Sequence, residues 1–201
     1  MSGLDTFQDT FAEAQPYPRR HPVRRFLFRL FLVLVLIAGA GVGYVWRYQP
    51  LAYGSTYGVR GDDVRETESA GGSSVVTYGA GLSFETIFSI RNTGRVTVRI
   101  TDVPDTDFAA ILASYDVMVM PRRATAYDES DAETFRPFTL LPGEERILNL
   151  RYTFRDCGEP ATAGNRTVRR QPVRYELAQA FERVADVVLG QPLVIRRVPT
   201  C

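Results

Sequence analysis

The sequence contains no lysine, since all 24 of its basic residues are arginine. Schiff-base and other lysine chemistry is therefore excluded. Its only histidine, His21, stands before a long apolar stretch, so the chain beyond that stretch has no imidazole for a catalytic triad or a histidine metal site. Its only tryptophan, Trp46, lies near the end of the stretch, so the C-terminal part lacks a tryptophan surface for stacking on sugars. We expect a protein that is not an enzyme, with no catalytic residue, metal or cofactor.

The net charge of +1 is small, but the charges are separated along the chain. Residues 1–18 carry three acids and no base, whereas residues 19–29 carry five arginines and no acid. Beyond residue 48 there are 18 arginines against 20 acidic residues, which excludes a basic nucleic-acid-binding domain. Residues 1–25 are predicted to form a disordered cytoplasmic tail that ends in a basic flank.

Residues 26–48 form the long apolar stretch and predict a transmembrane helix. From Leu30 to Trp46 there are 17 uncharged residues, a length of about 26 Å at ~1.5 Å per residue. The arginines before the stretch favour a cytoplasmic N-terminus and a C-terminal domain outside the plasma membrane, in a single-pass protein. A cleaved signal peptide is the alternative, but the long stretch and the long tail before it favour an uncleaved signal-anchor.

Gly39 and Gly43 form a G-x-x-x-G pattern within this predicted helix. Such a face lets two membrane helices approach closely, so a weak homodimer is one interpretation. The alternative is that both glycines reflect the ordinary frequency of glycine in membrane helices.

The chain after the apolar stretch divides into two parts. Residues 49–73 are rich in glycine, serine and charge, and are predicted to be a flexible linker. Residues 74–201 contain short alternating segments separated by turn signals such as NTG at 92–94 and LPGEE at 141–145. This pattern predicts an all-β domain, an immunoglobulin-like β-sandwich preceded by the one transmembrane helix.

Two segments of this domain depart from simple alternation. Residues 105–115 carry apolar side chains at helical spacing, which predicts a short helix or helical turn between strands, capped by Asp105 or Thr106. Residues 175–189 also fit helical spacing, but their β-branched content and local alternation favour two strands.

The chain has two cysteines, Cys157 and Cys201. Outside a membrane such a pair is most simply a disulfide, here closing a long loop onto the C-terminal residue. A free pair, or an intermolecular link through Cys201, is the alternative.

Four segments and a terminal cysteine stand out within about 88–201: FSIRNTGRVTVRITDV, LLPGEERILNLRYTFRDC, PVRYEL and VVLGQPLVI. Together with the N-terminal anchor, they resemble single-pass envelope proteins of high-GC Gram-positive bacteria. The resemblance implies an immunoglobulin-like domain outside the membrane, mostly without an assigned activity, and it carries over no catalytic residue.

The densest acidic segment is the loop 128–133, with Asp128, Glu129, Asp131 and Glu133. We expect a solvated loop whose acids pair with the preceding Arg122 and Arg123. The alternative function is a carboxylate-based hydrolase or a calcium- or carbohydrate-binding accessory domain, although the spacing lacks the pattern of a calcium loop. The favoured interpretation is a membrane-anchored module that binds or scaffolds another envelope protein or polymer. We expect no binding to nucleic acid.

Overall fold

The computed structural model describes residues 22–61, 63–67, 72–105, 108–122, 124–158, 164–177 and 181–199. These residues belong to two compact units, which divide between Tyr48 and Gln49. Residues 1–21 of the predicted tail lie outside the described part of the chain.

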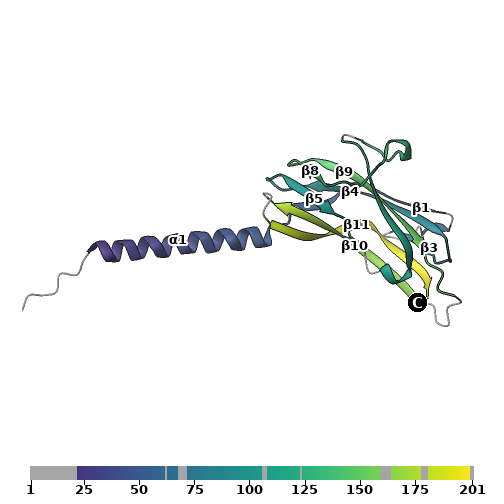
Figure 1. Ribbon diagram of the computed structural model, residues 1–201, viewed down its shortest axis with the longest axis horizontal. Coiled ribbons are helices and arrows are strands. Elements are labelled where there is room, and N and C mark those ends of the chain that lie inside the picture. The colour runs from purple at the N-terminus through teal and green to yellow at the C-terminus, as the bar shows by residue number, and fades with distance from the viewer. Residues whose placement is uncertain are drawn as a thin grey trace, which may run out of the picture. The chain divides into compact units, whose positions relative to one another are not determined.

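The first unit contains a long helix, α1, over Pro22–Arg47 (Figure 1). A proline suits the first position of a helix because the amide that it lacks would have no partner there. Arg47 lies in the last turn, where a positive charge is favourable. The helix has an arginine-rich first part that is followed by apolar residues. None of the helices in the described ranges combines the length and the hydropathy that crossing a membrane requires. The transmembrane character of 26–48 stays a prediction.

The part of the second unit that the structure describes is built from eleven strands in two sheets (Figure 1). Sheet A has the order β1-β4-β9-β6-β7, and sheet B has the order β2-β3-β11-β10-β5-β8. The bounds in sheet A are β1 Leu51–Gly61, β4 Ser83–Asn92, β9 Glu145–Phe154, β6 Leu112–Val119 and β7 Glu133–Thr134. In sheet B they are β2 Val64–Thr67, β3 Ser73–Thr77, β11 Phe181–Val198, β10 Gly164–Leu177, β5 Val98–Asp102 and β8 Phe138–Leu140. The same part of the chain also contains two 3₁₀ turns, η1 at Ala109–Ile111 and η2 at Glu129–Asp131.

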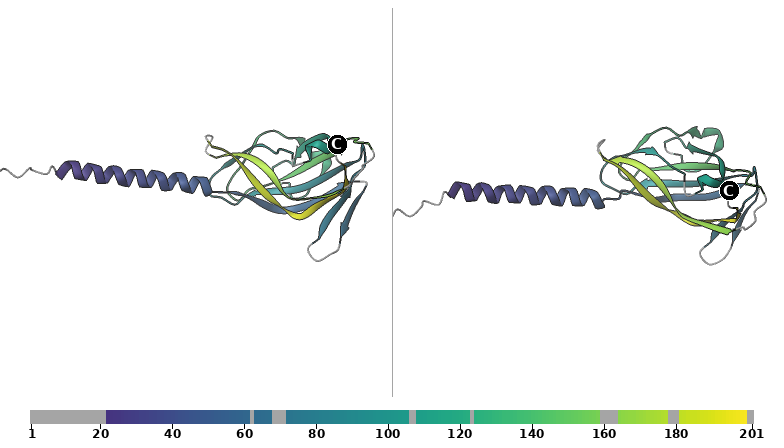
Figure 2. Two further views of the ribbon diagram at one scale, coloured as in Figure 1. Left: turned by 90° about the horizontal axis from the view of Figure 1, so that it is seen from below. Right: turned by 60° about the horizontal axis from the view of Figure 1, so that its bottom comes forward.

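This strand order is that of an immunoglobulin-like sandwich. The series β1-β4-β9-β6 matches the four-stranded ABED sheet of that fold, and β11-β10-β5 matches its GFC sheet. Strand β3 extends the second sheet by running parallel to β11, and β8 extends it on the far side of β5. The predicted β-sandwich is therefore confirmed (Figure 2).

The core lies between the inner faces of the two sheets. Side chains that point inward from sheet A meet those of sheet B, and all are fully or almost fully buried: Phe84, Phe88, Ile90, Leu148, Leu150 and Tyr152 from the first, and Ile100, Val173, Tyr175, Val187 and Ile195 from the second. Phe84 and Tyr152 stack with ring centroids 4.8 Å apart. Each such side chain contributes roughly 1.5–3 kcal/mol by leaving water, so the period-two alternation orients the strands that carry it.

Asn92 lies at the NTG turn, where the chain passes from one sheet to the other. The segments on either side of the turn do form β4 and β5, but these strands belong to opposite sheets and make no hairpin. Asn92 is fully buried where the chain crosses over, and its Nδ2 donates to the carbonyl oxygens of Val96 at 2.8 Å and Leu140 at 3.0 Å. Its Oδ1 accepts from the backbone amide of Gly94 at 2.9 Å. This side chain therefore holds the crossover in place of a hairpin ladder.

The predicted flexible linker 49–73 is wrong over much of its length. Its first half forms β1, which pairs antiparallel with β4, and its later part forms β2, which pairs with β3. Two of the glycines that suggested a linker lie in close contacts within the sheet. At Gly54 a Cβ would meet the carboxylate of Glu145 and the hydroxyl of Ser89, and Gly61 has a φ of 151° with a Cβ position 2.9 Å from the carbonyl oxygen of Ser83.

The two ambiguous segments are also resolved. The predicted helical turn in 105–115 is present as η1, but its N-cap is Phe108, with no side-chain cap, and Leu112 already begins β6. Thr106 lies outside the described residues. The segment 175–189 contains the end of β10 and the beginning of β11, as expected for two strands. Strand β11 then continues to Val198, with a register shift against β10 between Val188 and Leu193.

Candidate functional site

The outer face of sheet A is covered by the chain's own loop between β6 and β7. Met120, Ile87 and Ile147 form a small buried cluster on this face. Three partly buried residues of the loop pack against the cluster: Ala124, Tyr127 and Ala132. The loop therefore buries this part of the outer face.

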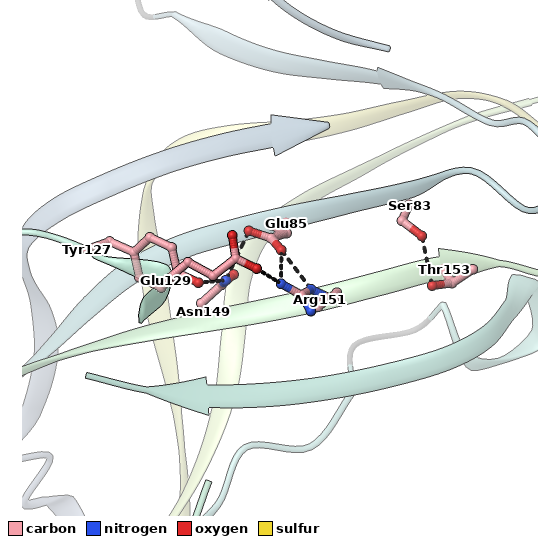
Figure 3. A network of polar contacts seen from close by, with 7 residues as sticks. All are labelled: Ser83, Glu85, Tyr127, Glu129, Asn149, Arg151 and Thr153. Atoms are coloured by element: carbon pink, nitrogen blue, oxygen red, sulfur yellow. Dashed lines mark hydrogen bonds and ion pairs between the residues drawn. The ribbon is translucent and has the colours of Figure 1, made fainter. Parts of the chain in front are cut away.

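Beside this cluster, the outer face carries a row of charged residues of alternating sign. The strand registers place Arg60 opposite Glu85, Glu85 opposite Arg151, and Arg151 opposite Asp116. The Nη2 atom of Arg151 lies 2.6 Å from Oε1 of Glu85 and 2.8 Å from Oε1 of Glu129 (Figure 3). Hydrogen bonds to these two carboxylates, the one to Glu85 first, raise the pKa of the Arg151 guanidinium. The row thus fastens the covering loop to the sheet.

Tyr127 joins the loop to the same row. Its hydroxyl accepts a hydrogen bond of 2.6 Å from Nδ2 of Asn149, which is buried on β9 (Figure 3). Nδ2 of Asn149 also donates to Oε2 of Glu85 at 3.0 Å, and the guanidinium carbon of Arg60 lies 5.4 Å from the centre of the Tyr127 ring. These contacts hold Tyr127 and its loop against the outer face of sheet A.

The acidic loop 128–133 is used for structure. Asp128 accepts hydrogen bonds from the hydroxyl and the amide of Ser130, which lower the pKa of Asp128 and cap η2. Glu129 pairs with Arg151, and Glu133 lies in β7. Within the described ranges no group of three or more histidine, cysteine or acidic side chains is placed to hold a metal ion.

The expected partners of these acids are wrong in one respect. Arg122 donates instead to the carboxylate of Glu144, at 2.5 Å from Nε and 3.0 Å from Nη2, and so supports the turn before β9. Arg123 lies outside the described residues. The cation that does pair with the loop, Arg151, is on β9, 22 residues beyond Glu129 in the sequence.

The outer face of sheet B has a different character. Val184 and Val188 of β11 are each 55% exposed, and so is Phe181 at the start of that strand. Two ion pairs cross the neighbouring strands, Arg99 with Glu176 at 3.5 Å and Arg174 with Asp102 at 3.7 Å. Both pairs are largely exposed, so they contribute little stability and leave a surface of mixed charge beside exposed valines.

The sequence did not predict one group of residues that lie together in the structure. Arg166, Arg169 and Arg170 of β10 line a cavity whose volume is about 680 Å³. The available signal was the density of arginine in the segment NRTVRRQPVR. It was missed because the positions of these arginines at a strand edge depend on where β5 ends.

Two predicted features remain without a structural test. Gly39 and Gly43 lie in α1, and a Cβ added at either glycine would meet no atom within 4 Å. No free cysteine occurs in the part of the chain that the structure describes, and Cys201 lies outside it. The helix dimer and the Cys157–Cys201 disulfide stay predictions.

Comparisons with known proteins find only distant likenesses. No family matches the chain, and no curated protein does. The apo PCuAC domain of PmoF2 aligns at 12% identity and a TM-score of 0.26, covering 68% of this chain and 92% of that domain. The PapD-like domain 7 of human CEP192 aligns at 12% identity and a TM-score of 0.27, covering 69% and 87%. The apo PCuAC domain of PmoF1 aligns at 12% identity and a TM-score of 0.27, covering 67% of this chain and 96% of that domain. The likeness to PCuAC and PapD-like domains is distant, and these values support no conclusion about fold or activity.

Proposed function

We propose that the protein is a non-enzymatic binding module, held at a membrane by α1, that contacts another envelope protein through the outer face of sheet B. The observation that carries this proposal is the contrast between the two outer faces. The outer face of sheet A is covered by the loop around Tyr127, whereas sheet B exposes Val184 and Val188 next to crossed ion pairs. Exposed apolar side chains rimmed by polar ones are typical of protein–protein contact surfaces.

The membrane part of the proposal is supported by α1. Large apolar side chains from Phe26 to Ile37 are 45–66% exposed along this helix. An exposed apolar surface of this extent is typical of a site that contacts a membrane or another protein. The arginine-rich first part of the helix favours a membrane, because anionic lipid headgroups attract cations. The finer interpretation is a single-pass anchor in the plasma membrane, with the N-terminus in the cytoplasm and the sandwich outside.

Site-specific photo-cross-linking tests the binding face. A photoreactive residue is placed at Val184 or Val188 of the full-length protein in cells, and at Ser114, an exposed position on β6, as the control. We expect the same distinct adduct from both β11 positions and none from Ser114. The double variant V184E/V188E carrying a nearby probe should lose the adduct while keeping its thermal unfolding transition. Equal adducts from all three positions, or none from β11, would contradict the proposal.

Fractionation tests the membrane part separately. The full-length protein is expected in the membrane fraction after alkaline extraction, and L34R/L36R should move it to the soluble fraction, since arginine within an apolar helix costs about 2.5–3.5 kcal/mol at the bilayer centre. Labelling of the single-cysteine variants S2C and S114C, in a C157S/C201S background, then decides between a helix that crosses the membrane and one that lies in its surface. Only the S114C variant should be labelled from outside. A soluble wild-type protein would reject the anchor.

A further inference from the structure

The cavity beside β10 has the position and the size of a ligand site. It is lined by the five consecutive residues 166–170 of β10, by Pro172, by Asp186 of β11, and by Asp105 and Phe108 from the segment after β5. Neighbouring side chains of a strand point to opposite faces, so a run of consecutive lining residues means that the cavity follows the edge of the strand. Its volume of about 680 Å³ lies within the range of small-molecule sites.

The edge that borders the cavity is an open one. Strand β11 pairs with β10 from Gly164 to Leu177, whereas β5 pairs with β10 only from Arg174 to Leu177. Among the strands that the structure describes, residues 164–173 therefore have a partner on one side only. An open edge presents backbone N–H groups that can donate to a ligand.

A buried side chain fixes the opposite wall of the cavity. After β5 the chain turns away from β10, and Nε2 of Gln171 donates a hydrogen bond of 2.8 Å to the carbonyl oxygen of Pro104. Gln171 is almost completely buried, and so is Phe108 at the end of the turned segment. The cavity is thus held by the fold itself.

Two of the arginines that line the cavity have no acidic partner among the described residues. Arg99, Arg122, Arg151 and Arg174 each pair with an acid. Arg169 and Arg170 form no ion pair with any residue in the described ranges, although both line the cavity. A guanidinium offers a planar set of donors that matches a carboxylate or phosphate.

We propose that this cavity binds an oxyanion, a carboxylate or phosphate group, through the guanidinium groups of Arg169 and Arg170 and the open edge of β10. Asp105 and Asp186 in the lining offset part of the positive charge. The ligand is therefore held by directed hydrogen bonds more than by overall attraction. The site adjoins the exposed valines of β11, because Asp186 lies between Val184 and Val188 and Arg170 pairs with Val188, but it does not depend on their role.

Titration calorimetry on the full-length protein in a neutral detergent tests the site. The probes are inorganic phosphate and glucuronate, which separate a phosphate source from a carboxylate source, at constant ionic strength set with chloride. We expect saturable binding of at least one probe, and a loss of about tenfold or more in affinity for R169Q/R170Q, because each charge-assisted hydrogen bond contributes substantially.

The matched control is R91Q/R136Q, which removes the same number of charges at exposed positions outside the cavity. This variant should bind like the wild type, and the thermal unfolding of both variants should match that of the wild type. Absence of saturable binding of both probes would overturn the proposal, as would an equal loss in the control. Tighter phosphate binding identifies phosphate as the source of the oxyanion, and tighter glucuronate binding identifies carboxylate.

Discussion

Replacement of Asn92 by alanine is the sharpest test of how the two sheets are joined. The side chain is fully buried and takes part in three hydrogen bonds, two as donor to Val96 and Leu140 and one as acceptor from Gly94. Each bond contributes about 1 kcal/mol net, so N92A should lower the free energy of unfolding by about 3 kcal/mol. For a domain of this size that corresponds to a fall in Tm of about 6–12 °C.

The assay is urea unfolding of the full-length protein in detergent, followed by near-UV circular dichroism. Buried tyrosines such as Tyr152 and Tyr175 report on the sandwich in this signal. The control is N165A, an exposed asparagine on β10, which should change stability by less than about 0.5 kcal/mol. A loss below about 1 kcal/mol for N92A would refute the inference that this side chain holds the crossover.

A second variant at the same position gives a pH signature. In N92D the carboxylate would face the carbonyl oxygens of Val96 and Leu140, so the folded state should favour the protonated acid and raise its pKa. A raised pKa means that the folded state binds more protons than the unfolded state, so stability relative to wild type should fall as the pH rises from about 4 to 7. A pH-independent difference between N92D and wild type would contradict the two donor contacts.

Two further predictions concern Gly54 and Arg122, whose structural contacts differ from those expected from the sequence. G54A should destabilise the sandwich by about 1–3 kcal/mol in urea unfolding, because the new Cβ would displace the Glu145 carboxylate, which accepts hydrogen bonds from the amide and the hydroxyl of Ser55; G58A, with nothing within 4 Å, is the control. The hydrogen bond from Arg122 lowers the pKa of Glu144, so its stabilising contribution is present above the unfolded pKa of about 4.3 and is lost as the pH falls through the folded value. The stability difference between wild type and R122Q should therefore shrink on acidification below about pH 4.3, and a difference unchanged between about pH 7 and about pH 3 would refute the assignment.

The strands of the core were predictable because their inner faces are apolar at period two. In β9 the inward residues Leu148, Leu150 and Tyr152 alternate with polar or charged ones, and this local signal survives in the fold. Strand β1 gave no such signal. Its polar composition and its glycines reflect close contacts with Ser83 and Glu145, which are distant in sequence.

The candidate sites were harder to predict for a related reason. The partner of Arg151 is Glu85, and the two meet only because β4 and β9 pair in one register across 66 residues. The loop cover around Tyr127 depends on the same register. The cavity beside Arg169 and Arg170 depends on the early end of β5. None of these is encoded in a short window of sequence.

The start of the sandwich and its crossover are joined at one place, and this has a mechanical consequence. Leu51 at the beginning of β1 pairs with Asn92, and the carbonyl oxygen of Pro50 accepts hydrogen bonds from the amide of Thr93 at 2.8 Å and from its hydroxyl at 3.1 Å. Tension applied to the chain through α1 reaches these bonds before any other part of the ladder between β1 and β4. A force that pulls on α1 would therefore act on the turn that links the two sheets. The first hydrogen bonds to break would be those between Thr93 and Pro50, and their loss would loosen both the crossover and β1.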